Sequence, residues 1–424
     1  MRETELILYR LGERDVLIRD MARLMEEFDL VSFYDVVNRI LEMAAQNGFY
    51  GNLWHCCLTD FLLNHENAYS LGCEIHGESN ASLKELVLHD FEIISELYHY
   101  DFNLFPKGAH KEVLSSVLEF KESVKGGNIY NDRIRSLICE TAVMLGGCKK
   151  TEDFGEIVTK CYEKYGVGKF GLHKAFRIQN QNGKTEVVPI RRITHVNLDD
   201  LVGYEIAKKK LIENTEAFVE GRRANNCLLF GDAGTGKSSS IKAIINQYYD
   251  QGLRIIEIYK HQFQELNEVL AQVKNRNYKF IIYMDDLSFE ENELEYKYLK
   301  AVIEGGMEKK PDHVLIYATS NRRHLIRETF RDKEDRREGD IHTGDTVQEK
   351  LSLVARFGVT IYFEAPMKKE FQQIVLTLAK RNQVEMADEE ILAEANKWEL
   401  YHGGMSGRSA QQFIDYLLGT KVGK

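Results

Sequence analysis

Eight consecutive residues, GDAGTGKS at 231–238, constrain this chain more than any other feature of its sequence. They fit the pattern G-x-x-x-x-G-K-[ST], directly follow the apolar run CLLF, and open a helical pattern. Glycines let the backbone curl around a phosphate and turn its N–H groups inward, while the N-terminus of the following helix adds a favourable dipole. The sequence therefore predicts a phosphate-binding loop between a strand and a helix.

The alternative is a glycine-rich turn without a ligand, but the four fixed positions match by accident in about one or two of a hundred chains this long. Lys237 is expected to reach the β- and γ-phosphates, and Ser238 to coordinate magnesium. The predicted nucleotide-binding residues of this loop are Gly231, Asp232, Ala233, Gly234, Thr235, Gly236, Lys237, Ser238 and Ser239.

Two further apolar runs end in polar side chains suited to the same chemistry. FIIYMDD ends in Asp285 and Asp286, and HVLIYATSN ends in Asn321. A carboxylate at a strand tip holds magnesium, which assigns that role to Asp285. Asp286 is expected to orient or deprotonate the attacking water, and its side chain is one methylene shorter than the glutamate expected there. Asn321 is expected to position the water or the γ-phosphate.

Two arginines follow these motifs. Arg356 stands in EKLSLVARFGVTIYF, and Arg408 stands in GGMSGRSAQQF at the predicted start of a helix. A guanidinium group is permanently charged and planar, so it suits the charge that develops on a transferred phosphoryl group. Either arginine alone is more often a surface ion-pair partner, but their order after the first three motifs favours a functional role.

The rest of the chain divides by pattern. Apolar residues recur at helical spacing from residue 1 to about 165, and residues 175–190 predict a β-hairpin turning at 182–183. Strands alternating with helices follow, which indicates a mostly parallel sheet. We expect strands at 226–230, 254–259, 278–284, 313–319 and 359–363. We expect helices at 237–249, 262–273, 292–306 and within 367–419, and a loop at 331–340.

Composition narrows the class of protein. The net charge of -10 excludes a chain that is basic throughout, so nucleic-acid binding would need a local patch. The sequence shows neither an export signal nor an apolar stretch of about 18 residues, so we expect a cytoplasmic protein without membrane insertion. Its seven cysteines favour reduced thiols. A zinc site at His55, Cys56, Cys57, Cys73 and His76 is disfavoured, because adjacent cysteines do not match the usual ligand spacing.

From about residue 194 to 424 the chain resembles the AAA+ ATPases. LDDLVGYE looks like the segment that packs on adenine, which implies contacts from Val202 and Gly203. GDAGTGKS looks like Walker A, FIIYMDD like Walker B, SNRRHL like sensor 1 and SGRSAQQF like sensor 2. Several phrases, including MDDLSFE and HTGDTVQEKLSL, are most similar to a bacterial AAA+ group catalogued only as a domain of unknown function.

The resemblance carries implications for assembly. Arg356 would be the arginine finger that acts on ATP bound by a neighbouring subunit, and Arg408 would contact the γ-phosphate from a small helical lid. This implies a homo-oligomer, either a hexamer or an open ring. KHQFQEL stands where an aromatic pore loop would follow the second strand, so a threading unfoldase is less favoured.

The expected fold is therefore α/β, a P-loop NTPase of AAA+ type with a five-stranded parallel sheet. We expect an α-helical domain at 1–174, a hairpin and linker at 175–193, the nucleotide-binding core at 194–366 and a helical lid at 367–424. The expected activity is hydrolysis of Mg-ATP at subunit interfaces, to remodel or load an unidentified protein or nucleic acid recognised through residues 1–174.

Two alternatives remain. One is a nucleotide-gated switch or DNA-binding adaptor with little hydrolysis, for which Arg322, Arg323, Arg327 and Arg331 would supply a local basic patch. The other is a small-molecule kinase, which shares the phosphate loop but leaves Arg356, Arg408 and the large N-terminal region unexplained.

Overall fold

The structure is a computed structural model of the 424-residue chain, and it divides into two compact units, Met1–His173 and Lys174–Lys424. Each unit is described by itself. Among the helices described, none is both long and apolar enough to cross a membrane. The residues that the structure describes are 2–13, 15–77, 80–106, 111–121, 131–181, 183–190, 193, 196–289, 293, 295–304, 310–321, 325, 353–402 and 404–421.

The first unit is helical, as its apolar spacing predicts. Trp54 is fully buried and its Nε1 donates to Leu97 O at 2.9 Å, while buried Asp90 accepts N–H groups from Leu8 and Tyr9. Its α-helices are α1 (Val16–Glu26), α2 (Leu30–Asn47), α3 (Leu53–Asn64), α4 (Ala68–His76), α5 (Ala81–Tyr98), α6 (Lys111–Leu118), α7 (Asp132–Gly146), α8 (Thr151–Tyr165) and α9 (Gly168–Leu172).

The cysteines of this unit behave as apolar side chains. Cys56, Cys57 and Cys73 are buried, and burial and neighbouring groups raise the pKa of each thiol above its usual value. No group of three or more His, Cys, Asp or Glu side chains in the described ranges is arranged to hold a metal ion.

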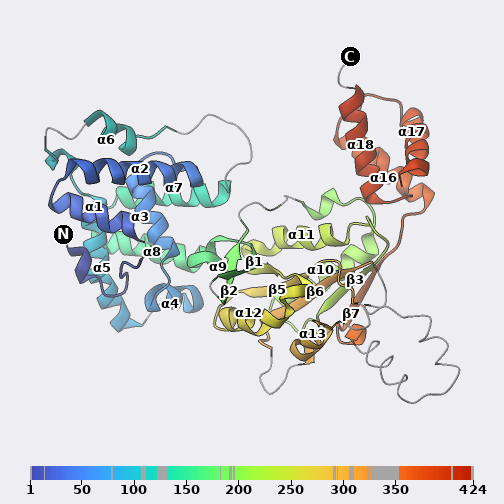
Figure 1. Cartoon of the computed structure of the whole chain (residues 1–424), viewed down its shortest axis with the longest axis horizontal. Coiled ribbons are helices and arrows are strands. Elements are labelled where there is room, and N and C mark those ends of the chain that lie inside the picture. The colour runs from blue at the N-terminus through green and yellow to red at the C-terminus, as the bar shows by residue number, and fades with distance from the viewer. Residues whose placement is uncertain are drawn as a thin grey trace. The chain divides into compact units, whose positions relative to one another are not determined.

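The second unit is built on a seven-stranded sheet with the order β2-β1-β4-β5-β6-β3-β7 (Figure 1). The five strands from β4 to β7 in this order are parallel neighbours and confirm the five predicted positions within two residues. The strands are β1 (Ala175–Gln181), β2 (Lys184–Pro189), β3 (Cys227–Gly231), β4 (Leu253–Glu257), β5 (Lys279–Met284), β6 (Val314–Ser320) and β7 (Val359–Phe363).

The predicted count of five strands is too low, because the hairpin joins the sheet. Strand β1 pairs antiparallel with β2 and parallel with β4, with Phe176 opposite Ile256. Phe176, Ile178 and Val187 are buried, so this pairing places apolar side chains of the hairpin in the core of the unit. The sheet therefore begins at Ala175.

Helices cover both faces of the sheet in Figure 1, with α11 on one face and α12 and α13 on the other. Helix α10 was not predicted, because its apolar positions form only a weak stripe and no side chain caps its first residue. The α-helices of this unit are α10 (Glu205–Val219), α11 (Lys237–Tyr248), α12 (Leu266–Val273), α13 (Glu295–Glu304), α16 (Lys368–Arg381), α17 (Asp388–Tyr401) and α18 (Gly407–Lys421).

Helices α16, α17 and α18 form a small bundle with its own apolar core, which contains Phe371, Val375, Ala395 and Phe413. Val202 of the α/β part packs against this core. The phosphate loop, Asp285 and Ser320 lie at the carboxyl ends of β3, β5 and β6, which are parallel. The carboxyl ends of parallel strands lie at the same edge of a sheet, so these groups lie close together.

Candidate nucleotide-binding site

The phosphate loop leaves β3 at Gly231 and enters α11 at Lys237. Gly231, Gly234 and Gly236 have φ of 133°, 77° and 89°, which L side chains rarely adopt. A Cβ atom on Gly231 would lie 2.1 Å from Phe363 O, and one on Gly234 would lie 2.9 Å from Ser406 Oγ. Backbone conformation therefore favours glycine at all three positions, and close packing adds to this at Gly231 and Gly234.

Lys237 lies inside this loop and is buried. Its Nζ donates to Gly231 O at 2.8 Å and to Asp232 O at 2.6 Å. Burial lowers the pKa of Lys237, and the nearby carboxylates of Asp232, Asp286 and Asp285 partly oppose that shift. An ammonium group is thus held among the main-chain groups that would surround a phosphate.

Asp285 receives two hydroxyl groups at one oxygen. Ser238 Oγ donates to Asp285 Oδ1 at 2.7 Å, and Thr319 Oγ1 donates to the same atom at 2.6 Å. Burial acts to raise the pKa of Asp285, but the bonds from Thr319 and Ser238 outweigh it and hold that pKa below its usual value. A charged carboxylate beside a hydroxyl is the hard oxygen donor set that Mg²⁺ prefers, so Ser238 and Asp285 fit this ion.

Asp286 has an unusual backbone. Its φ is 49°, in the left-handed region, where Asp and Asn are tolerated better than longer side chains. Its N–H donates to Thr319 Oγ1 at 2.9 Å, and Asn321 Nδ2 donates to Asp286 Oδ1 at 2.9 Å. Thr319 therefore connects both aspartates, and Asn321 fixes the second carboxylate.

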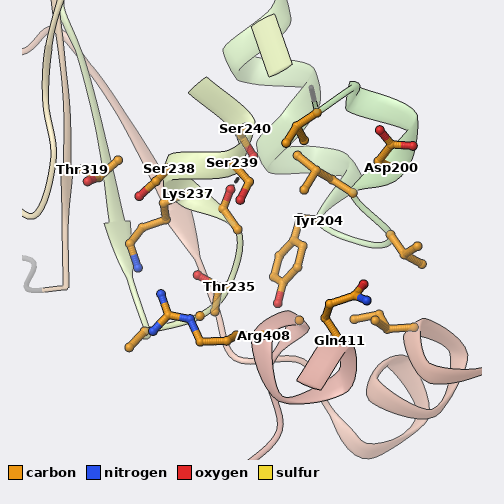
Figure 2. Close-up of a pocket in the computed structure, with 18 of the residues that line it drawn as sticks. Asp200, Tyr204, Thr235, Lys237, Ser238, Ser239, Ser240, Thr319, Arg408 and Gln411 are labelled. Carbon is orange, nitrogen blue, oxygen red and sulfur yellow. Dashed lines mark hydrogen bonds between the residues drawn. The ribbon is translucent and has the colours of Figure 1, made fainter. Parts of the chain in front are cut away.

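These groups line a cavity of about 770 Å³ between the α/β part and the helical bundle. Figure 2 shows Lys237 and Arg408 toward one end of it, and Asp200 and Gln411 toward the other. Arg408 N donates to Gly234 O at 3.1 Å, which joins α18 to the phosphate loop. Tyr204 lies between the ends, and burial is the largest cause that raises its pKa to about 12.

The apolar part of the cavity comes from Leu201 and Val202 on one side and from Ile374 and Leu378 of α16 on the other. The cavity therefore combines a polar end, with a lysine, hydroxyls and carboxylates, and an apolar slot. That combination matches a ligand with a phosphate chain and a flat ring system.

Most of the predicted site residues line this cavity. They are Val202, Ala233, Gly234, Thr235, Gly236, Lys237, Ser238, Ser239, Asp285, Asp286, Asn321 and Arg408. Four predicted residues are absent from the lining: Gly203, Gly231, Asp232 and Arg356. Gly231 and Asp232 instead supply carbonyls to Lys237, and Arg356 is half-buried just before β7. The basic positions 322, 323, 327 and 331 lie outside the described residues.

Sequence reasoning missed several lining residues. Thr319 belongs to the ATSN motif, and its place beside Asp285 follows only from the pairing of β5 with β6. Leu201 and Tyr204 belong to LDDLVGYE, and three further residues belong to SGRSAQQF, whereas Ile374 and Leu378 stand in no motif. The missed lining residues are Val196, Asp200, Leu201, Tyr204, Lys208, Ser240, Thr319, Ile374, Leu378, Gly407, Gln411 and Gln412.

Comparison with known protein families matches more than half of the chain. The sequence model of the family described as "Protein of unknown function (DUF815)" matches residues 171–421. The chain is also 28% identical over 108 residues to replication factor C subunit 3 of Schizosaccharomyces pombe, covering 25% of this chain and 30% of that protein. It is 34% identical over 71 residues to the replication factor C large subunit of Staphylothermus marinus, covering 16% of each. This chain thus spans less than a third of either relative.

Solved structures resemble about half of the chain at low similarity. A mutant of Thermotoga maritima RuvB has a TM-score of 0.37 and 19% identity, covering 53% of this chain and 65% of that one. The FIGL-1 AAA domain in complex with ADP has a TM-score of 0.36 and 17% identity, covering 54% and 74%. These values are too low to carry an inference about function. The predicted α/β P-loop arrangement is confirmed by the fold of the chain itself, with β3 and its phosphate loop between β6 and β7 and a helical bundle after the sheet.

Proposed function

Because the chain belongs to the family described as protein of unknown function (DUF815), we propose its function from the site itself: it binds Mg-ATP in the cavity and hydrolyses it. The observation that carries this proposal is the arrangement of three groups in one cavity. These are Lys237 within the phosphate loop, the Ser238–Asp285 pair, and the Asn321–Asp286 pair. Each pair is joined by a hydrogen bond, so their side chains are already oriented.

Each of these residues has a separate role in binding or hydrolysis. Lys237 exchanges its bonds to Gly231 O and Asp232 O for phosphate oxygens, which matches its charge to theirs. Asp286 orients or deprotonates the attacking water, and Asn321 holds the carboxylate in place. Ser238 and Asp285 would hold magnesium, which would supply charge neutralisation for the phosphates.

We also propose that the active site is completed by a second subunit. Arg356 does not line the cavity of its own chain, which is consistent with action on ATP bound by a neighbour. Arg408 acts from the lid of the same chain, where it already lies against the phosphate loop. The assembly is a hexamer or an open ring, and residues 1–174 bind the unidentified protein or nucleic acid that it remodels or loads.

Steady-state ATP hydrolysis, measured against protein concentration, tests this function. The wild type is compared with Lys237→Ala, with Arg356→Ala, and with an equal mixture of the two variants. We expect turnover per subunit to rise with concentration, each variant to lose it, and the mixture to recover part of it. Recovery follows because Lys237→Ala subunits offer an intact Arg356 to the intact Lys237 sites of their neighbours. Equal turnover by the wild type and Lys237→Ala would refute the proposal.

A nucleotide-gated switch with little hydrolysis is the second candidate. Asp286 favours it, because its carboxylate is one methylene shorter than glutamate and its backbone holds an unusual left-handed conformation. Tight ATP binding with negligible turnover at every protein concentration would support the switch over the ATPase.

A further inference from the structure

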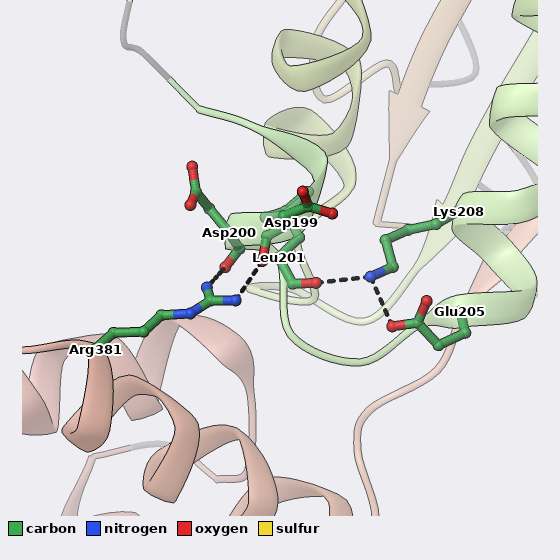
Figure 3. A network of polar contacts seen from close by, with 6 residues as sticks. All are labelled: Asp199, Asp200, Leu201, Glu205, Lys208 and Arg381. Carbon is green, nitrogen blue, oxygen red and sulfur yellow. Dashed lines mark hydrogen bonds and ion pairs between the residues drawn. The ribbon is translucent and has the colours of Figure 1, made fainter. Parts of the chain in front are cut away.

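Two cations from different helices bind three consecutive main-chain carbonyls beside the cavity (Figure 3). Arg381, the last residue of α16, donates Nη1 to Asp200 O at 2.9 Å and Nη2 to Asp199 O. Lys208 of α10 donates Nζ to Leu201 O at 2.8 Å. We call these two side chains and the three carbonyls the carbonyl latch.

The donors and acceptors of the carbonyl latch match in number and geometry. Leu198–Asp200 form a short 3₁₀ helix, and carbonyls at the end of a helical turn lack partners within the helix. The planar guanidinium of Arg381 presents two N–H groups side by side, so it binds two adjacent carbonyls at once. In Figure 3 its bonds lead to main-chain oxygens and not to the carboxylates of Asp199 and Asp200.

The same carbonyls belong to one wall of the cavity. Asp200, Leu201 and Val202 all line it. On the lid side, Ile374 and Leu378 line the opposite wall, and Arg381 follows them on the same helix. Residues at i, i+4 and i+7 share one face of an α-helix, so the latch and the apolar wall belong to one surface of α16.

The lid is thereby joined to the α/β part at both ends of the cavity. At the phosphate end, Arg408 N bonds to Gly234 O, and at the apolar end Arg381 bonds to Asp199 and Asp200. Both Arg381 and the two aspartates are exposed, whereas the bundle has its own apolar core in α16, α17 and α18. The latch therefore fixes the lid at the apolar end of the cavity, next to the packing of Val202 on the bundle core, and is not what folds the lid.

We propose that Arg381 is a positioning residue for the base end of the nucleotide, an inference that rests on the proposed function. By fixing α16 to the 199–201 segment, it sets the separation between Ile374 and Leu378 on one wall and the Leu201–Val202 wall. Loss of the Arg381 side chain weakens contacts with the base. Contacts with the phosphates persist, because they depend on the loop, Lys237 and Arg408, and Arg408 keeps its own bond to Gly234 O.

The test uses the full chain and two competing ligands. ATP and inorganic tripolyphosphate, each with magnesium, displace a fluorescent ATP analogue from the wild type, Arg381→Ala, Arg381→Lys and Lys380→Ala. Lys380 is the matched control, because it is an exposed cation next to Arg381 on α16. For Arg381→Ala we expect the Kd of ATP to rise about five- to tenfold and that of tripolyphosphate to stay within about twofold. Arg381→Lys keeps the charge but loses the planar guanidinium, so its Kd for ATP should lie between those of the wild type and Arg381→Ala. Lys380→Ala should behave as the wild type.

An equal loss for both ligands would overturn the inference, because it would place Arg381 in general support of the lid. An unchanged Kd for ATP in Arg381→Ala would overturn it as well. Both results leave the proposed function intact. A wild type that binds neither ATP nor its analogue would refute the proposed function and this inference with it.

Discussion

Replacing Thr319 by valine would test how the two aspartates are held. Thr319 is buried, and its Oγ1 makes two bonds at once, donating to Asp285 Oδ1 at 2.6 Å and accepting the Asp286 N–H at 2.9 Å. Valine has nearly the same shape, so Thr319→Val removes both bonds without opening a cavity.

The expected loss follows from these two bonds. A neutral main-chain bond is worth about 1 kcal/mol, and the bond to Asp285 is worth about as much after allowance for the exposure of that carboxylate. Their sum of about 2 kcal/mol corresponds to about 30-fold faster hydrogen exchange at the Asp286 amide. The pKa of Asp285 also rises when a bond that lowers it is lost, so Mg-dependent ATP binding fails at a higher pH on the acid side.

Hydrogen exchange of peptides that contain Asp286, followed by mass spectrometry, measures the effect. Thr319→Ser is the matched control, because serine restores the hydroxyl but not the methyl group, and it should keep most of the protection. Unchanged exchange in Thr319→Val would refute the reasoning, as would equal losses in both variants, which would assign the effect to packing.

Further predictions concern Asp286 and Lys237. Asp286→Asn should keep ATP affinity within about twofold and slow hydrolysis about 100-fold or more in single-turnover assays, since an amide cannot take a proton. Asp286→Glu should lower the free energy of unfolding by about 1 kcal/mol in a urea titration, because longer side chains disfavour the left-handed backbone. Burial lowers the pKa of Lys237 from 10.5. The affinity for ATP should therefore be highest at neutral pH, where Lys237 is charged, and fall as the pH rises through this lowered pKa. Affinity in Lys237→Arg should stay level over that range of a fluorescence titration, because arginine remains charged.

Local patterns predict much of this fold. The five parallel strands are recognisable because they are short apolar runs bounded by turn residues, and the phosphate loop because its glycines are needed by the backbone. The pairing of β1 with β4 is not predictable in this way, since nothing in either segment specifies a partner about 80 residues away. Helix α10 is missed because its apolar stripe is weak.

In the candidate site, too, many of the residues that stand in local motifs were predicted and those that depend on long-range contacts were not. Lys237, Ser238, Asp285 and Asn321 stand in motifs whose spacing carries chemical meaning, and the structure brings them into one cavity. Arg381 stands in no motif, because its partners are main-chain carbonyls and any sequence supplies those. Such contacts can be identified only from the three-dimensional structure, which places the lid beside residues 199–201.

The β1–β2 hairpin determines which shortened forms of this protein keep the sheet intact. A shortened protein that starts after residue 190, where the hairpin ends, would lose β1 and β2 and leave the main chain of β4 unpaired along one side. Gln272, which binds Val187 N and Thr185 O, would lose both partners as well. An uncovered strand edge recruits other chains, so we expect that fragment to aggregate on expression. One that starts at Gly171, three residues before the second unit, would keep the edge covered and is the better material for isolating the nucleotide-binding half.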